Sequence, residues 1–189
     1  MIFRTALVAL ALALAGCNQQ ASKDGAQESA ALDTPAPDSR PDSVFTPNND
    51  AARNTTGQLT MNVALRLPDA GSTNTDQQEV LTLRGASGLV VEAAITGAVS
   101  PATQVQGQTL RALLNIPVEE PQVLVYRVTN ETKPEGVGGL CGAEAADYVV
   151  VWEPSAPGAA SMRIIATRGG PPGAGGARAC SMLDYGRGG

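Results

Sequence analysis

From Gln58 onward, apolar and polar residues alternate in short runs that glycine and proline interrupt. In the clearest run, residues 59–67, every second position is Leu, Met or Val. Because successive strand residues point to opposite faces, this period of two predicts a strand with one buried face. Further strands are predicted at 80–84, 89–96, 110–116, 122–129, 148–152, 162–167 and 180–185. The run 110–116 can also be read as a helix, but its shortness and the proline after it favour a strand.

The spacing of these strands predicts the fold class. Strands this short, separated by Gly and Pro, are typical of antiparallel all-β folds. Residues 148–152 are apolar at every position, which predicts a central strand with two buried faces. We therefore expect a small antiparallel β-sandwich or partly open barrel of about seven to eight strands over residues 58–187.

The segment before the predicted domain has a different composition. Residues 18–57 are rich in Ala, Ser, Asp, Gln, Asn and Pro, and Val44-Phe45 is their one apolar spot. A segment with so few large apolar residues cannot offset the entropy lost on ordering its backbone. Residues 17–57 are therefore predicted to be a disordered tether, and whether Val44-Phe45 packs on the domain stays open.

The first sixteen residues have the pattern of a secretory signal peptide. Arg4 supplies a positive charge, residues 7–14 are apolar, and the small residues Ala15 and Gly16 follow. An apolar run this short cannot cross a hydrocarbon core, which needs about 20 residues. The alternative, a buried N-terminal helix ending in a free thiol, is disfavoured because polar sequence follows at once.

The sequence Leu14-Ala15-Gly16-Cys17 resembles the lipobox of bacterial lipoprotein precursors. The resemblance implies cleavage before Cys17, acylation of its sulfur and acylation of the new amino terminus. Several acyl chains give a stable membrane anchor. Asn18, where an aspartate would favour the inner membrane, points to the periplasmic face of the outer membrane. The resemblance covers only this N-terminal segment, and no family is recognised for residues 58–187.

Two cysteines remain once Cys17 is assigned to lipid. An exported protein lies in an oxidising compartment, so we expect Cys141 and Cys180 to form a disulfide. It would close a loop of about 40 residues and pin the connection at 132–146 to the last strand.

Composition makes several activities improbable. The chain has no histidine, so neither a Ser-His-Asp triad nor a histidine metal site is available. Its net charge of −5 lacks the basic excess that nucleic acid selects, and its six aromatic residues offer few stacking surfaces. Glu119-Glu120 is interpreted as a solvated turn. We therefore expect no catalytic residues, no metal site, no cofactor and no nucleic-acid partner.

One charge asymmetry suggests a partner surface. Residues 131–153 carry five acids, whereas residues 160–189 carry four arginines. Arg168 and Arg178 flank the glycine-rich connection 169–177, which we expect to be exposed, and they are a candidate surface for a partner. The alternatives, which the sequence favours, are that the two segments pair with each other or are merely solvated.

Three functions fit these observations. The first is a lipid-anchored, non-catalytic protein-binding module of the cell envelope. The second is a small-ligand carrier or carboxylate-based enzyme, which needs a pocket where acids such as Glu144, Asp147 or Glu153 converge. The third is a structural envelope component. The oligomeric state is not predicted.

Overall fold

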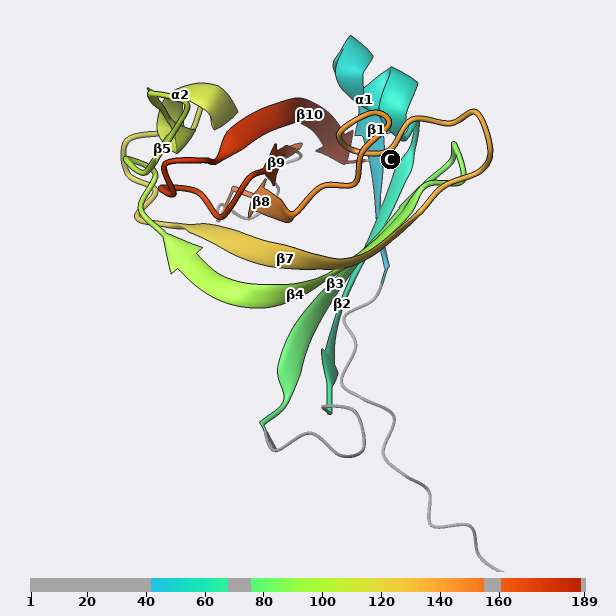
Figure 1. The fold of residues 1–189 in the computed structure, drawn as a ribbon, viewed down its shortest axis with the longest axis horizontal. Helices are drawn as coiled ribbons and strands as arrows, with labels where there is room; N and C mark the ends of the chain where they lie inside the picture. Colours follow the sequence, from blue (N-terminus) through green and yellow to red (C-terminus); the bar gives the residue numbers. More distant parts are fainter. Residues whose placement is uncertain (1–41, 68–75, 155–160, 188–189) are drawn as a thin grey trace, which may run out of the picture. The chain divides into compact units, whose positions relative to one another are not determined.

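A computed structural model describes residues 42–67, 76–154 and 161–187, and in these ranges the chain forms an antiparallel β-barrel (Figure 1). Eight strands close the barrel in the order β1-β10-β9-β8-β7-β4-β3-β2. The predicted all-β fold is confirmed, and the barrel is closed rather than partly open. The strands are β1 (Ser43–Pro47), β2 (Leu59–Arg66), β3 (Gln78–Gly85), β4 (Val90–Val99), β7 (Val123–Thr132), β8 (Tyr148–Trp152), β9 (Ser161–Arg168) and β10 (Arg178–Arg187).

The barrel interior is the main hydrophobic core. Alternate residues of each strand point inward, and their side chains fill the space between the barrel walls. On β2, for example, Leu59 and Met61 are 1% and 8% exposed, in line with the predicted period of two. The largest fully buried members are Phe45, Leu59, Leu81, Leu89, Leu140, Met162, Ile164, Leu183 and Tyr185.

A second core lies on the outside of the barrel. An insertion between β4 and β7 forms the short strands β5 (Gln104–Val105) and β6 (Gln108–Thr109) and the helix α2 (Leu110–Leu114). Its apolar side chains pack with outward-facing residues of β7, β8 and β9. Strand β8 therefore buries both faces, with Val149 and Val151 in the interior and Val150 outside. The predicted central strand is confirmed.

The strand predicted over 110–116 is wrong, because α2 occupies this segment. Thr109 begins the helix by accepting a hydrogen bond from the Ala112 amide at 3.2 Å, and Asn115 ends it in a left-handed conformation. Leu110 and Leu114 are buried on one helix face. These two positions fit a period of two as well as a period of 3.6, so the pattern could not separate strand from helix.

The barrel starts earlier in the chain than predicted. Strand β1 pairs with β2 and β10, Phe45 is 1% exposed, and the helix α1 (Asp50–Thr55) follows. The predicted tether boundary at residue 57 is therefore wrong, since residues 43–57 belong to the barrel. Strand β1 has only two large apolar residues, Val44 and Phe45, which are too few to be recognised as a strand from their pattern. The predicted signal peptide and the tether up to residue 41 lie outside the described residues.

Helix α1 and the connection 133–147 close one end of the barrel. Ala52 from α1 and Leu140 from the connection both belong to the interior core. The Tyr185 hydroxyl lies 2.7 Å from Thr56 Oγ1, and both residues are buried. Gly85 is required at this end, because a Cβ there would lie 2.8 Å from the Thr56 carbonyl oxygen.

Two features fasten the connection 133–147 in place. The Glu131 carboxylate accepts hydrogen bonds from the amides of Leu140, at 3.1 Å, and Ala146, at 3.0 Å. A disulfide joins Cys141 to Cys180 on β10, with their Cα atoms 5.1 Å apart. The predicted disulfide is confirmed, and it pins the connection to the last strand as expected.

Candidate functional site

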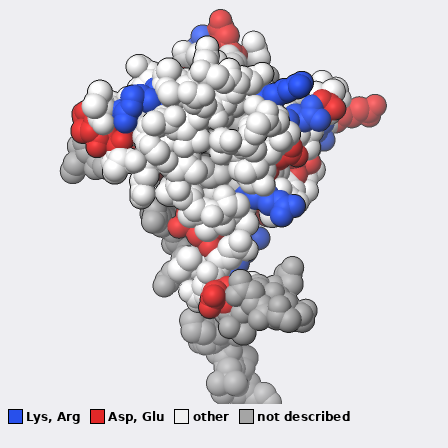
Figure 2. Space-filling view, turned by 60° about the vertical axis from the view of Figure 1, so that its left-hand side comes forward, with Lys and Arg blue, Asp and Glu red and all other residues white. Residues whose placement is uncertain are grey.

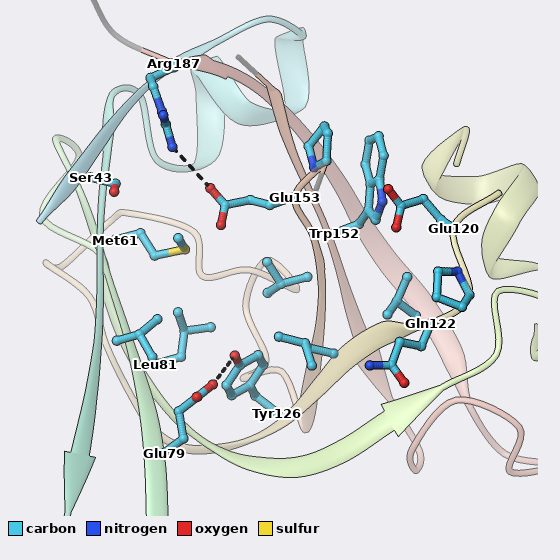
Figure 3. Close-up of a pocket in the computed structure, with 16 residues that line it drawn as sticks. Ser43, Met61, Glu79, Leu81, Glu120, Gln122, Tyr126, Trp152, Glu153 and Arg187 are labelled. Carbon is cyan, nitrogen blue, oxygen red and sulfur yellow. Dashed lines mark hydrogen bonds and ion pairs between the residues drawn. The ribbon is translucent and has the colours of Figure 1, made fainter. Parts of the chain in front are cut away.

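A cavity of about 620 Å³ opens at the other end of the barrel (Figure 3). Sites for small molecules in proteins typically enclose about 300–1,000 Å³ and are mostly apolar with a few polar groups. The mouths of β-barrels are among their common locations. The barrel therefore resembles a cup, with a closed base formed by α1 and the connection 133–147.

The period of two along each strand places charged residues around this mouth. On β3 the inward-facing row runs from Leu83 through Leu81 to Glu79. The inward rows of β8 and β10 end in the same way, at Glu153 and Arg187. The same alternation that fills the core thus ends in charged side chains where the strands reach solvent.

The inner wall of the cavity is apolar. Strands β2, β3, β7 and β8 contribute its aliphatic side chains, which are Met61, Val63, Leu81, Leu124 and Val151. Most of these residues are also part of, or packed against, the interior core, so the cavity wall is continuous with well-packed structure. A rigid apolar wall can take up the hydrocarbon part of a ligand without reorganising.

Two polar contacts lie across the mouth. The Tyr126 hydroxyl donates a hydrogen bond to Glu79 Oε1 at 2.7 Å. Arg187 Nη2 lies 4.0 Å from Glu153 Oε1, and Figure 3 shows this pair on the side of Ser43. Carboxylates, a phenol and a guanidinium can orient the polar head of a ligand whose apolar part enters the barrel.

The far wall of the cavity is formed by residues 120–123 and Trp152. Trp152 is 5% exposed, and its Nε1 has no hydrogen-bond partner among the described residues. Figure 3 shows its ring nitrogen on the side of Glu120. The Arg163 guanidinium lies over the ring, 5.2 Å from its centroid, and makes a cation–π contact with it.

Arg163 and Arg111 donate hydrogen bonds to backbone carbonyls of the segment between α2 and β7 and of the end of α2. Arg163 donates to the carbonyls of Leu114 at 2.8 Å and Asn115 at 2.7 Å, which fixes the end of α2 to β9. Arg111 donates to the carbonyls of Ile116 at 3.3 Å and Glu120 at 3.4 Å. Glu119-Glu120 lie in or beside a turn, as predicted, but Glu120 also lines the cavity.

The acids proposed from the sequence for a pocket do not converge. Glu153 lines the cavity, but Glu144 forms an ion pair with Arg168. Asp147 accepts a hydrogen bond from the Gly169 amide at 2.8 Å. The predicted grouping of Glu144, Asp147 and Glu153 is therefore wrong.

Three residues of the mouth were missed by the sequence analysis, namely Glu79, Tyr126 and Arg187. The signal for Glu79 was present, because it lies two and four positions before Leu81 and Leu83 on the same strand face. Tyr126 lies on the inward face of β7 and is 2% exposed. That Tyr126 and Glu79 meet depends on strand order, which the sequence does not give.

Arg168 and Arg178 line a separate hollow of about 300 Å³ with Gly169 and Gly176. The ion pair of Arg168 with Glu144 agrees with the alternative in which the acidic and basic segments pair. Figure 2 shows the insertion side of the barrel, where charged side chains lie at the margins of a largely uncharged surface. A partner surface at Arg168 and Arg178 stays a prediction.

The connection 169–177 is less exposed than predicted. Ala177 is 4% exposed and belongs to the outer core. The Gly173 amide donates to the Gln104 carbonyl at 3.0 Å, and the Ala179 amide donates to Gln106 Oε1 at 3.1 Å. The connection therefore packs on the β5–β6 hairpin, a contact between segments that are distant in sequence.

In the described part of the chain, no three His, Cys, Asp or Glu side chains gather in a way that could hold a metal ion. None of the helices described there is long and apolar enough to cross a membrane.

No protein-family model matches the chain, and no curated protein or solved structure does either.

Proposed function

We propose that the protein is a lipid-anchored carrier of the bacterial cell envelope that binds a small amphiphilic molecule in the mouth of its barrel. The observation that carries this proposal is the 620 Å³ cavity with an apolar inner wall and charged residues at its rim. Binding rather than catalysis is proposed, because the arrangement suits holding a two-part ligand.

The division of the cavity into two chemical zones supports an amphiphile. Each Å² of apolar surface removed from water contributes about 25 cal/mol, so a hydrocarbon chain against Met61, Leu81 and Val151 gains affinity by burial. Charged side chains at the rim, such as Glu79 and Arg187, give orientation and specificity to the polar head.

The place where the chain joins the barrel supports a role near a membrane. Ser43, the first residue of β1, lines the cavity. If Cys17 carries lipid, the anchor is attached through the segment that leads to Ser43, at the mouth end of the barrel. We place the protein on the periplasmic face of the outer membrane on the basis of the lipobox and Asn18.

The experiment uses 1-decanol as the probe and the full chain carrying Cys17→Ser, which needs no detergent. Trp152 is the only tryptophan and lines the cavity, so its fluorescence reports on the site. We expect a saturable change in emission. Val63→Phe, which fills the mouth, should weaken binding at least tenfold, whereas Val44→Phe, at a site outside the cavity lining, should not. A response without saturation, or one that Val63→Phe leaves intact, would refute the proposal.

A protein-binding module is the second candidate function. The observation that favours it is that Leu65 and Leu67, at the end of β2, are 36% and 70% exposed. Exposed apolar side chains in a cluster often mark a contact surface. Cross-linking in intact envelopes, repeated with Leu65→Ser and Leu67→Ser together, tests this candidate. Loss of one specific cross-linked protein in the variant would support it, and an unchanged pattern would count against it.

A further inference from the structure

The rim of the cavity carries an excess of negative charge. Glu79, Glu120 and Glu153 line it, and Arg187 is the single basic residue of the described chain that does so. The cavity lining thus carries three carboxylates and one guanidinium. A mouth with this imbalance attracts a positively charged group and disfavours a negatively charged one.

Glu79 is less exposed than Glu153, and its hydrogen-bond partner is neutral. The Tyr126 hydroxyl donates to Glu79 Oε1 at 2.7 Å, which satisfies part of the carboxylate but supplies no positive charge. Glu79 is half-buried beside the apolar wall. Coulomb attraction is stronger in such a setting than in open water, so a cation placed here gains more than one on the outer surface.

Glu153 and Arg187 form a long and solvent-exposed ion pair. The closest atoms are 4.0 Å apart, and the side chains are 37% and 54% exposed, respectively. Exposed pairs of this kind contribute little to stability. Glu153 can therefore turn toward a ligand at small cost, and Arg187 does not neutralise the rim.

The Trp152 indole supplies an independent sign that the wall receives a polar group. Trp152 is 5% exposed and lines the cavity, and its Nε1 lacks a hydrogen-bond partner in the described ranges. A buried donor without an acceptor is costly, and a turn of the indole that brings Nε1 to the cavity would let an oxygen of a bound molecule remove that cost.

We propose that the cavity selects an amphiphile whose head combines a cationic amine with an oxygen acceptor. The ammonium group lies between Glu79 and Glu153, the oxygen accepts from Trp152 Nε1, and the alkyl chain covers Met61 and Leu81. This inference rests on the proposed function, because it specifies the ligand of the same cavity.

The test compares three ten-carbon probes by calorimetric titration into the full chain with Cys17→Ser. The probes are N-decylethanolamine, which has an amine and a hydroxyl, 1-decanol, which is neutral, and decanoate, which is anionic. We expect N-decylethanolamine to bind at least fivefold more tightly than decanol, and decanoate to bind most weakly. Raising the salt concentration should reduce the advantage of the amine.

Variants that remove one negative charge test whether Glu79 and Glu153 cause the preference for the amine probe. Glu79→Gln and Glu153→Gln should each lower the affinity ratio of N-decylethanolamine to decanol about threefold to fivefold. The matched control is Glu135→Gln, at an exposed position in the connection that closes the other end, and it should keep the native ratio. Two acids are tested so that a folding defect in one variant does not decide the outcome.

The outcomes distinguish a failure of the cationic selection from a failure of the carrier function. If decanol binds but the amine binds no more tightly, or if neither glutamate variant changes the ratio, the cationic selection is refuted and the carrier function stands. If none of the three probes binds, the carrier function itself is refuted.

Discussion

At the scale of the residue, the position of a polar side chain along an inward-facing row decides what it can do. Tyr185 lies deep in the β10 row and bonds with Thr56, so it contributes to the closed base. Arg187 lies two positions further along the same row and reaches the open mouth. The same alternation therefore provides both a structural contact and a candidate ligand contact.

Tyr185 makes the stability of the barrel sensitive to alkaline pH. Burial raises the pKa of the Tyr185 phenol to about 12 from 10.0, and the hydrogen bond with Thr56 partly opposes that rise. Because the folded state holds the proton more tightly than the unfolded state, the stabilisation is complete below pH 10. It is lost as the pH rises toward 12, by up to about 3 kcal/mol in the free energy of unfolding.

Urea unfolding of the native chain and of Tyr185→Phe between pH 8 and pH 12 measures this loss. At pH 8 the variant should be about 1 kcal/mol less stable than the native chain, because it lacks the hydrogen bond with Thr56. Its free energy of unfolding should then fall less than that of the native chain as the pH rises to 12. Parallel declines in the two proteins would contradict the assignment.

Gly139 should tolerate no side chain. A Cβ at this position would overlap Glu131 Oε1, the atom that accepts the hydrogen bond from the Leu140 amide. We expect Gly139→Ala to lower the free energy of unfolding by about 1–3 kcal/mol, since overpacking forces a shift of the buried contact. Gly175→Ala is the control, because nothing lies within 4 Å of its Cβ position. Equal melting temperatures for the two variants would argue against a close approach.

At the scale of the element, runs with a strong apolar pattern were predictable and weakly patterned ones were not. The prediction for β2 rested on nine residues of alternation, and that for β8 on five consecutive apolar residues; both are confirmed. β1 has only two large apolar residues, and the buried Leu110 and Leu114 of α2 fit a period of two as well as a period of 3.6. Their structure depends on the barrel, because β1 pairs with both β2 and β10 and α2 packs on β7 to β9.

The disulfide acts on the element that closes the base. It links residues 39 positions apart and joins the connection 133–147 to β10. Replacing both Cys141 and Cys180 by Ser should lower the free energy of unfolding by about 4 kcal/mol in the chain-entropy estimate. Urea unfolding measures this, and reduction of the native chain should give a similar loss. Decanol affinity should change little, because neither cysteine lines the mouth.

A double serine variant as stable as the oxidised native protein would show that α1 and the Glu131 contacts hold the base without the disulfide. A large fall in decanol affinity would show that the base and the mouth are coupled.

At the scale of the whole molecule, the site depends on closure of the barrel. Glu79 and Tyr126 lie 47 positions apart in sequence on different strands, and Arg187 comes from a third strand. The sequence predicted the all-β class, but it could not give the order β1-β10-β9-β8-β7-β4-β3-β2 that brings these residues to one mouth. Glu153 was named in advance among the acids of a possible pocket, whereas the other mouth residues depend on that order.

The most direct test of a ligand-binding mouth is a crystal structure of the Cys17→Ser chain grown with N-decylethanolamine. We predict an alkyl chain in the cavity against Met61, Val63 and Leu81, with its nitrogen within 4 Å of a Glu79 carboxylate oxygen. A barrel mouth without the probe, at concentrations that saturate the calorimetric response, would contradict the account, as would a probe bound only outside the barrel.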